Sequence, residues 1–176
     1  MKVVRAVAVM VIAVMLVAGC GRSGGGGPVA QSAPAAKPSQ PVSAQLQFSA
    51  KTLDGAPFSG QSLLGKPAVL WFWAPWCPIC QHEAPGVGQV AQANPAVSFV
   101  GVAAQDQVPA MRDFVSRYQL GFFPQLADVD ASVWRQFGVT AQPAYAFIHP
   151  DGSVEVVKTG LSQSDLSHRV AALAAS

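Results

Sequence analysis

Two cysteines separated by two residues, in the segment Cys77-Pro78-Ile79-Cys80, are the side chains of this chain best suited to chemistry. Thiols one helical turn apart can close a disulfide, and such a pair can exchange it with the thiols of another protein. The apolar run Ala68 to Trp73 predicts a buried strand that ends just before them, and a helix-compatible segment begins at Pro78. Cys77 is then expected at the surface and at a helix N-terminus, where unpaired N–H groups and the helix dipole favour the thiolate. We therefore predict Cys77 as the attacking cysteine and Cys80, deeper in the helix, as the resolving one.

The same cysteine spacing occurs in zinc and haem sites, so these are the alternatives to a redox pair. A structural zinc site needs four ligands, but the chain has no second cysteine pair, and its three histidines, His82, His149 and His168, are scattered. Covalent haem attachment needs a histidine directly after the second cysteine, and this chain has Gln81 there. We expect neither a metal site nor a cofactor.

Segments with strand character alternate with segments of helical periodicity along the chain. Strands are predicted at Ala68 to Trp73, Val97 to Ala103, Ala144 to His149 and Ser153 to Lys158, the last two forming an antiparallel hairpin. Helices are predicted directly after the cysteines as far as Asn94, at Val108 to Tyr118, at Asp130 to Phe137 with Asp130 as its cap, and at Gln163 to Ala174. Residues 122–127 are expected to be a connector. This order predicts a three-layer α/β fold with a mixed central sheet.

The composition fits one globular domain with appendages. The chain has 176 residues, of which 51% are apolar and 11% charged, so the folded part can bury a sizeable core. The formal net charge of +2 includes Lys2 and Arg5, which lie in a segment that we expect to be removed. There is no basic cluster to bind phosphate, so we expect no nucleic-acid partner.

The first residues have the order of a secretory signal. Lys2 and Arg5 precede an apolar run from Ala6 to Val17, which is short for a membrane span, and small residues follow. Residues 1–19 are therefore predicted to be a signal peptide. The end of this segment, Val17-Ala18-Gly19-Cys20, resembles the bacterial lipobox, in which the cysteine is lipidated. An ordinary cleaved signal with an unrelated cysteine, or an uncleaved anchor, stays open as an alternative.

The segment from Cys20 to Ala44 is predicted to be a flexible tether because it is rich in Gly, Pro, Ser, Ala and Gln. It would join a lipidated Cys20 to a folded domain at residues 45–176. The expected location is the outer face of the cell membrane or the extracellular space.

Several motifs carry a resemblance to a known family. From Leu46 to about Leu173 the chain resembles the thioredoxin superfamily, in particular the branch of TlpA, ResA and the DsbE/DsbF-like oxidoreductases. The matching segments are Phe72 to Cys80, the Glu83-x-Pro85 that follows, Gln142-Pro143 and Pro150-Asp151-Gly152. The resemblance implies a thioredoxin-like fold, an extra N-terminal hairpin around Thr52 to Gly55, and thiol-disulfide oxidoreductase activity.

The resemblance also implies roles for residues around the cysteines. Glu83 would accept or pass a proton when Cys80 becomes a thiolate, although a solvated helix charge is the simpler alternative. Pro143 would be a cis-proline that faces the cysteines, leaving the backbone of Gln142 free to pair with an extended client. Trp76 and Pro78 would contact the client.

Three further tryptophans, Trp71, Trp73 and Trp134, are predicted to belong to the core. In thioredoxin itself a buried Asp stands where this chain has Trp71, so Glu83 would be the only acid near the pair.

Two relatives of the same fold perform other chemistry. Peroxiredoxins carry a hydroxyl residue three positions before the reactive cysteine, and this chain has Ala74 there. Sco-like copper carriers separate their cysteines by three residues and add a distant histidine, so His149 leaves a copper-carrying module as a distant alternative.

We predict an extracytoplasmic oxidoreductase that oxidises the dithiols of exported proteins and is recycled by a membrane redox partner. The alternative is a ResA-like reductase of specific clients such as apocytochrome c. The identity of the clients is not predictable from these residues.

Overall fold

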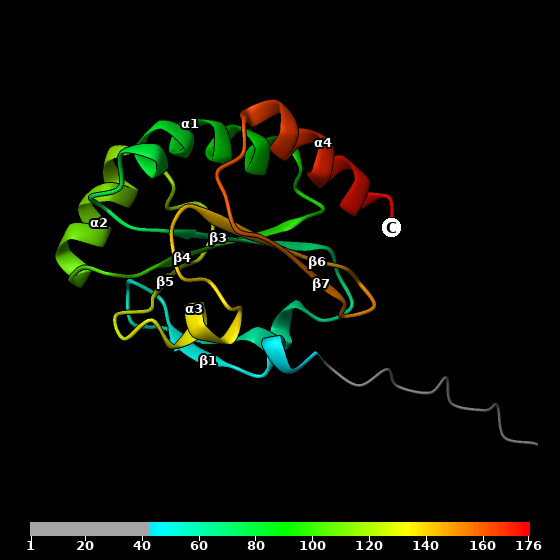
Figure 1. Cartoon of the computed structure of the whole chain (residues 1–176), viewed down its shortest axis with the longest axis horizontal. Coiled ribbons are helices and arrows are strands. Elements are labelled where there is room, and N and C mark those ends of the chain that lie inside the picture. The colour runs from blue at the N-terminus through cyan, green and yellow to red at the C-terminus, as the bar shows by residue number, and fades with distance from the viewer. Residues whose placement is uncertain (1–42) are drawn as a thin grey trace, which may run out of the picture. The chain divides into compact units, whose positions relative to one another are not determined.

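The computed structural model describes residues 43–176. Its centre is a five-stranded sheet with strand order β5-β4-β3-β6-β7, in which β4 and β5 run parallel to β3 and β6 runs antiparallel to it (Figure 1). The strands are β3 (Ala68–Trp73), β4 (Ser98–Ala103), β5 (Gln125–Ala127), β6 (Ala144–Ile148) and β7 (Val154–Val157). The mixed sheet and the β6–β7 hairpin confirm the predicted topology.

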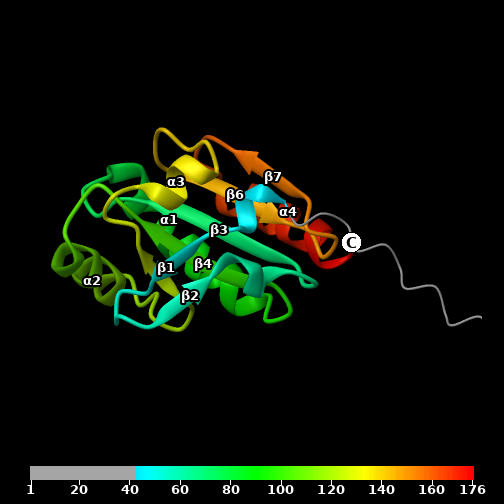
Figure 2. The ribbon, with the colours of Figure 1, turned by 90° about the horizontal axis from the view of Figure 1, so that it is seen from below.

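Helices cover one face of the sheet, and a smaller layer covers the other. The first face carries α1 (Pro78–Ala93), α2 (Val108–Arg117) and α4 (Gln163–Ala174). The opposite face carries α3 (Ser132–Gln136), the hairpin of β1 (Ser49–Lys51) and β2 (Pro57–Ser59), and the 3₁₀ turns η1 (Ala44–Leu46) and η2 (Gly60–Leu63) (Figure 2). These layers confirm the three-layer fold and its N-terminal hairpin.

Strand β3 joins the two halves of the core because both of its faces are buried. Successive side chains of a strand point to opposite faces, and all six residues of β3 are buried. Trp71 and Trp73 belong to the cluster under α1, α2 and α4, whereas Phe72 packs with Trp134 in the cluster on the other side. The three tryptophans predicted for the core are there, and each is at most 1% exposed.

The segment predicted to be a connector includes an edge strand. Gln125–Ala127 forms β5, which pairs in parallel with β4. The buried side chain of Gln125 accepts a hydrogen bond from Trp73 Nε1 at 3.2 Å and donates one to the Leu120 carbonyl at 3.1 Å. Three residues are too few to show the alternating pattern of a strand in the sequence. Whether this segment forms a strand therefore depends on its pairing with β4.

Helix α3 is held by a different aspartate from the one predicted. The N-cap residue is Ala131, and the buried carboxylate of Asp128 accepts the backbone N–H groups of Val133 and Trp134 at 3.0 and 2.9 Å. The carboxylate of Asp130 accepts the backbone N–H of Ser132 at 3.2 Å, and its carbonyl accepts Arg135 Nη1 at 2.6 Å. The prediction of Asp130 as the cap was therefore wrong, because the helix begins one residue later than predicted and the carboxylate of Asp128 reaches its first N–H groups instead.

The predicted signal peptide, the predicted lipidation site Cys20 and most of the predicted tether lie outside the described residues. Within residues 43–176, none of the helices combines the length and apolar character that crossing a membrane requires.

Candidate active site

The Cys77–Cys80 pair lies where β3 leads into α1. Cys77 is the N-cap residue of α1, Pro78 follows in the first turn, and the backbone N–H of Cys80 donates to Cys77 Sγ at 3.1 Å. The sulfur of Cys77 thus takes the place of the side-chain oxygen that usually caps a helix. Both cysteines are free, so the structure shows the dithiol form of the pair.

Cys77 is less exposed than predicted. Its side chain was expected at the surface, but the residue is only 4% exposed, and Cys80 is fully buried. The turn folds back on itself, with the N–H of Cys77 donating to the Ala74 carbonyl at 3.2 Å, and both sulfurs join the cluster beneath α1. The predicted order of depth is confirmed, since Cys77 is the more accessible of the two.

Burial strongly raises the pKa of Cys80, and its hydrogen bond with Cys77 and the nearby Glu83 carboxylate raise that pKa further. Cys80 therefore stays a thiol at neutral pH unless a base removes its proton. A buried thiol with a raised pKa fits the role of a resolving cysteine, which acts only after a base has removed its proton.

Glu83 is a buried carboxyl group rather than a solvated helix charge. The residue is 9% exposed; Tyr145 Oη donates to its Oε2 at 2.7 Å, and the backbone N–H of Leu161 donates to its Oε1 at 2.8 Å. Burial raises the pKa of Glu83 above its ordinary 4.5, while these two hydrogen bonds act in the opposite direction. Glu83 is thus a buried, hydrogen-bonded carboxyl group whose pKa lies above the ordinary value, and the simpler alternative of a solvated charge is wrong.

Gly160 is part of this site and was missed by the sequence analysis. A Cβ atom on Gly160 would lie 2.4 Å from Glu83 Oε1, 3.3 Å from Pro143 Cγ and 3.4 Å from Ile79 Cγ2. Gly160 therefore marks the point where α1, the start of β6 and the loop before α4 converge. No local pattern distinguishes this glycine from others that precede a capped helix.

Two exposed apolar side chains flank the cysteines along the chain. Trp76 is 52% and Ile79 57% exposed, and the indole N–H of Trp76 donates to the Gln105 carbonyl at 3.0 Å. The Gln142–Pro143 peptide bond is cis, as predicted; Gln142 is half-buried and Pro143 is buried. We refer to Trp76, Pro78, Ile79, Gln142 and Pro143 as the rim of the site.

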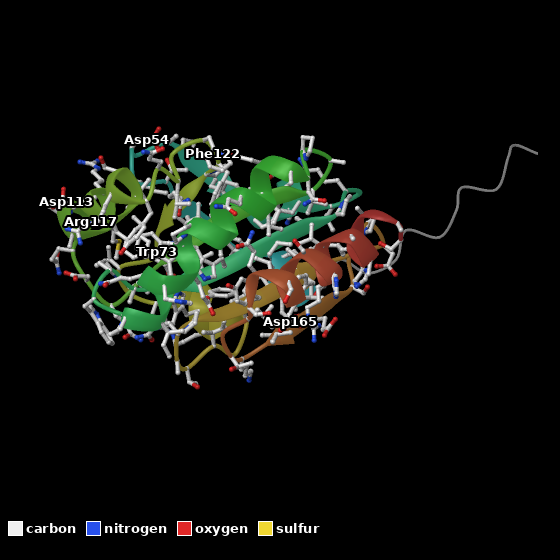
Figure 3. The ribbon with its side chains drawn as sticks, turned by 90° about the horizontal axis from the view of Figure 1, so that it is seen from above. Asp54, Trp73, Asp113, Arg117, Phe122 and Asp165 are labelled. Atoms are coloured by element: carbon white, nitrogen blue, oxygen red, sulfur yellow. The ribbon has the colours of Figure 1, made fainter. Side chains whose placement is uncertain are left out.

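Two hollows of the surface differ in their relation to this chemistry. A pocket of 340 Å³ between α1 and α4 is lined by Glu83, Tyr145 and Leu161, so it connects the carboxyl group with solvent. A larger groove of 700 Å³ is lined by residues that include Asp54 and Phe122, which Figure 3 labels, and neither cysteine is among its lining residues. Within residues 43–176, no three His, Cys, Asp or Glu side chains gather in a way that could hold a metal ion.

The fold and the dithiol at the start of α1 define a thioredoxin-like thiol-disulfide oxidoreductase. Residues 42–157 match the model of the AhpC/TSA family, and the chain belongs to this family.

Three individual proteins show which members of this family the chain is similar to. The structure of MTB DsbF in its mixed oxidised and reduced forms is 67% identical, with a TM-score of 0.75 over 76% of this chain and 99% of that chain. The soluble secreted antigen MPT53 of Mycobacterium tuberculosis is 54% identical over 132 residues, 73% of this chain and 76% of that protein. The thiol-disulfide oxidoreductase ResA of Bacillus subtilis is 30% identical over 108 residues, 60% of each chain. The chain is therefore similar to DsbF, MPT53 and ResA, and the similarity to DsbF and ResA confirms the resemblance that the sequence motifs carried.

Proposed function

We propose that this protein oxidises pairs of cysteine thiols in exported proteins and passes the electrons to a membrane redox partner. The observation that carries this direction is the N–H of Cys80, which donates to Cys77 Sγ at the N-terminus of α1. A hydrogen bond to this sulfur and the positive end of the helix dipole favour the reduced form of the pair. Stabilising the reduced form makes the disulfide form a stronger oxidant.

The proposed reaction proceeds in two exchanges. A client thiolate attacks Sγ of Cys77 in the oxidised pair, the Cys77–Cys80 bond breaks, and Cys80 leaves and takes up a proton. The second client thiolate then attacks the client sulfur of the mixed disulfide and releases Cys77 as a thiolate. The client loses two electrons and two protons, the pair gains the electrons, and a disulfide of the membrane partner restores the Cys77–Cys80 bond.

In this scheme Glu83 handles the proton of Cys80. It donates a proton when Cys80 leaves and accepts it when Cys80 attacks in the reverse direction. The support for this role is the burial of Glu83 and its effect on the pKa of Cys80.

We assign contact with the client to the rim. Trp76 and Ile79 offer exposed apolar surface beside Cys77, which suits unfolded segments with hydrophobic side chains. The backbone at Gln142 would pair with an extended client segment.

Reduction of specific clients, such as apocytochrome c, is the second candidate. The observation that favours it is the buried Glu83 near the pair, because a charged carboxylate opposes thiolate formation and so stabilises the disulfide form. The similarity to ResA points the same way.

The direct test is transfer of a disulfide to a client. Oxidised protein mixed with one equivalent of a reduced, unfolded exported protein should leave the client two hydrogens lighter and this protein two hydrogens heavier by mass spectrometry. If the client stays reduced while the protein stays oxidised, the oxidant role is refuted and the reductase is favoured.

We further propose that the protein acts outside the cytoplasm and is held to the membrane by a lipid on Cys20. The charged and apolar start of the chain and the secreted relative MPT53 support export. Cys20→Ser is expected to release the protein from the membrane fraction or to block its maturation, because the lipid can no longer be attached. A wild-type protein that fractionates as soluble and carries no lipid mass would refute the anchor but not the export.

A further inference from the structure

Tyr145 approaches the site from the sheet rather than from the helix of the cysteines. It lies on β6, directly opposite Trp71 of β3, and is fully buried. Its hydroxyl donates to Glu83 Oε2 at 2.7 Å. Burial and the Glu83 carboxylate raise the pKa of Tyr145 well above its ordinary value, so the hydroxyl remains a donor throughout the physiological pH range.

The other oxygen of the carboxyl group is held from a third element. The backbone N–H of Leu161, in the loop between β7 and α4, donates to Glu83 Oε1 at 2.8 Å. Gly160 makes this approach possible, because any side chain there would collide with the same oxygen. The Glu83 carboxyl group on α1 is thus oriented by one donor from β6 and one from the loop.

We propose that Tyr145 is a positioning residue: its hydroxyl fixes the Glu83 carboxyl group beside the cysteine pair and sets the pH range in which Glu83 exchanges a proton with Cys80. This inference rests on the proposed role of Glu83. Tyr145 itself does not touch the reacting sulfurs in this account; it acts through the carboxyl group.

Few other groups face the Glu83 carboxyl group and could change its pKa. The titratable side chains that face Glu83 are Cys80 and His82 from α1 and Tyr145 from β6. The loop contributes the backbone N–H of Leu161, and the adjoining pocket is lined by the N-cap residue Ser162 and by Gln163 and Leu166 of α4. The buried indole N–H of Trp71 makes no hydrogen bond of normal geometry. Its proximity nevertheless acts to lower the pKa of Glu83, as the hydrogen bond from Tyr145 does. Among the described residues, Tyr145 is therefore the one side chain that donates a hydrogen bond of normal geometry to the Glu83 carboxyl group.

The chain offers a simple direct measurement, because Glu83 and Glu155 are its only glutamates. Carbon-13 labelling of the glutamate carboxyl groups should give two titrating NMR signals, and Glu83→Gln identifies the one from Glu83. In Tyr145→Phe the Glu83 midpoint should rise by about one to two pH units, since a hydrogen bond to the charged form is lost. The exposed Glu155, paired with Arg169, should titrate as before.

Kinetics supply a second readout that a purely structural role of Tyr145 would not change. The rate at which Cys80 resolves a preformed mixed disulfide should rise with pH as Glu83 ionises, and Tyr145→Phe should move that rise upward by the same amount. In a Glu83→Gln background, Tyr145→Phe should leave the pH profile unchanged. Tyr118→Phe is the matched control, because Tyr118 at the end of α2 packs on Phe114 with ring centroids 4.6 Å apart and should shift nothing.

The outcomes separate this inference from the proposed function. An unchanged Glu83 midpoint in Tyr145→Phe, or a shifted midpoint without a shifted rate profile, would overturn the role of Tyr145 even if exchange with clients is normal. If the protein exchanges no thiols at all, the proposed function fails, and the rate profile cannot then support the role of Tyr145.

Discussion

Cys80→Ser is expected to leave the protein joined to its clients by mixed disulfides, whereas Cys77→Ser is expected to form almost none. The more accessible Cys77, at the N-cap of α1, still attacks a client disulfide in the first variant, but the buried thiol that would release the client is gone. Non-reducing gels and mass spectrometry of the protein incubated with a disulfide-bonded client measure the adducts.

The same experiment contains its own control. Serine replaces one sulfur by an oxygen in both variants. If circular dichroism shows that both variants fold equally well, a difference in their adducts reflects which of the two cysteines was replaced. Adducts that accumulate on Cys80 in the Cys77→Ser variant, and not the reverse, would show that the assignment of the attacking and resolving cysteines is inverted.

Glu83→Gln is expected to slow resolution of the mixed disulfide by about 100-fold near neutral pH, the lower end of what general acid–base catalysis contributes. Burial raises the pKa of Glu83 above 4.5 and also raises that of Cys80, so between these two values the wild type has an ionised base beside a protonated thiol. The deficit should therefore shrink at low pH, where Glu83 is protonated, and should persist up to pH 9, because the raised pKa of Cys80 keeps its thiol protonated there. Stopped-flow measurement of client release from pH 5 to 9 provides the profile.

A matched change elsewhere keeps this prediction specific. Glu155→Gln alters the only other glutamate, on the exposed edge strand β7, and should leave the profile as it is. Identical rates for Glu83→Gln and wild type across the whole range would remove Glu83 from the mechanism.

The parts of this site that lie close together in the sequence could be predicted from it. The buried strand, the turn and the proline after Cys77 predicted the N-cap position, because each is a local signal with a local physical cause. The relative depth of the two cysteines followed from helical geometry alone. The absolute burial of Cys77 did not, since it depends on how the turn folds back onto the core.

The surroundings of Glu83 depend on tertiary structure. Tyr145 and Leu161 are 62 and 78 residues away along the chain, and neither lies in a motif that indicates contact with a carboxyl group. Strand β5 was not predicted because it is defined by its pairing with β4, which is distant in the sequence. The capping of α3 by Asp128 was not predicted because it depends on the geometry of the turn between them. Resemblance predicted that Glu83 is near the pair, but only the structure shows what holds it.

The reduction potential of the Cys77–Cys80 pair tests the proposed direction of catalysis most directly. Equilibration with glutathione buffers of known ratio, followed by mass spectrometry of the trapped thiols, measures it without any assumption about clients. The account predicts a potential near the oxidising end of the thioredoxin-like scale, about −120 mV, because the helix N-terminus stabilises the reduced pair. A value close to that of thioredoxin, about −270 mV, would contradict the oxidant role and establish the pair as a reductant.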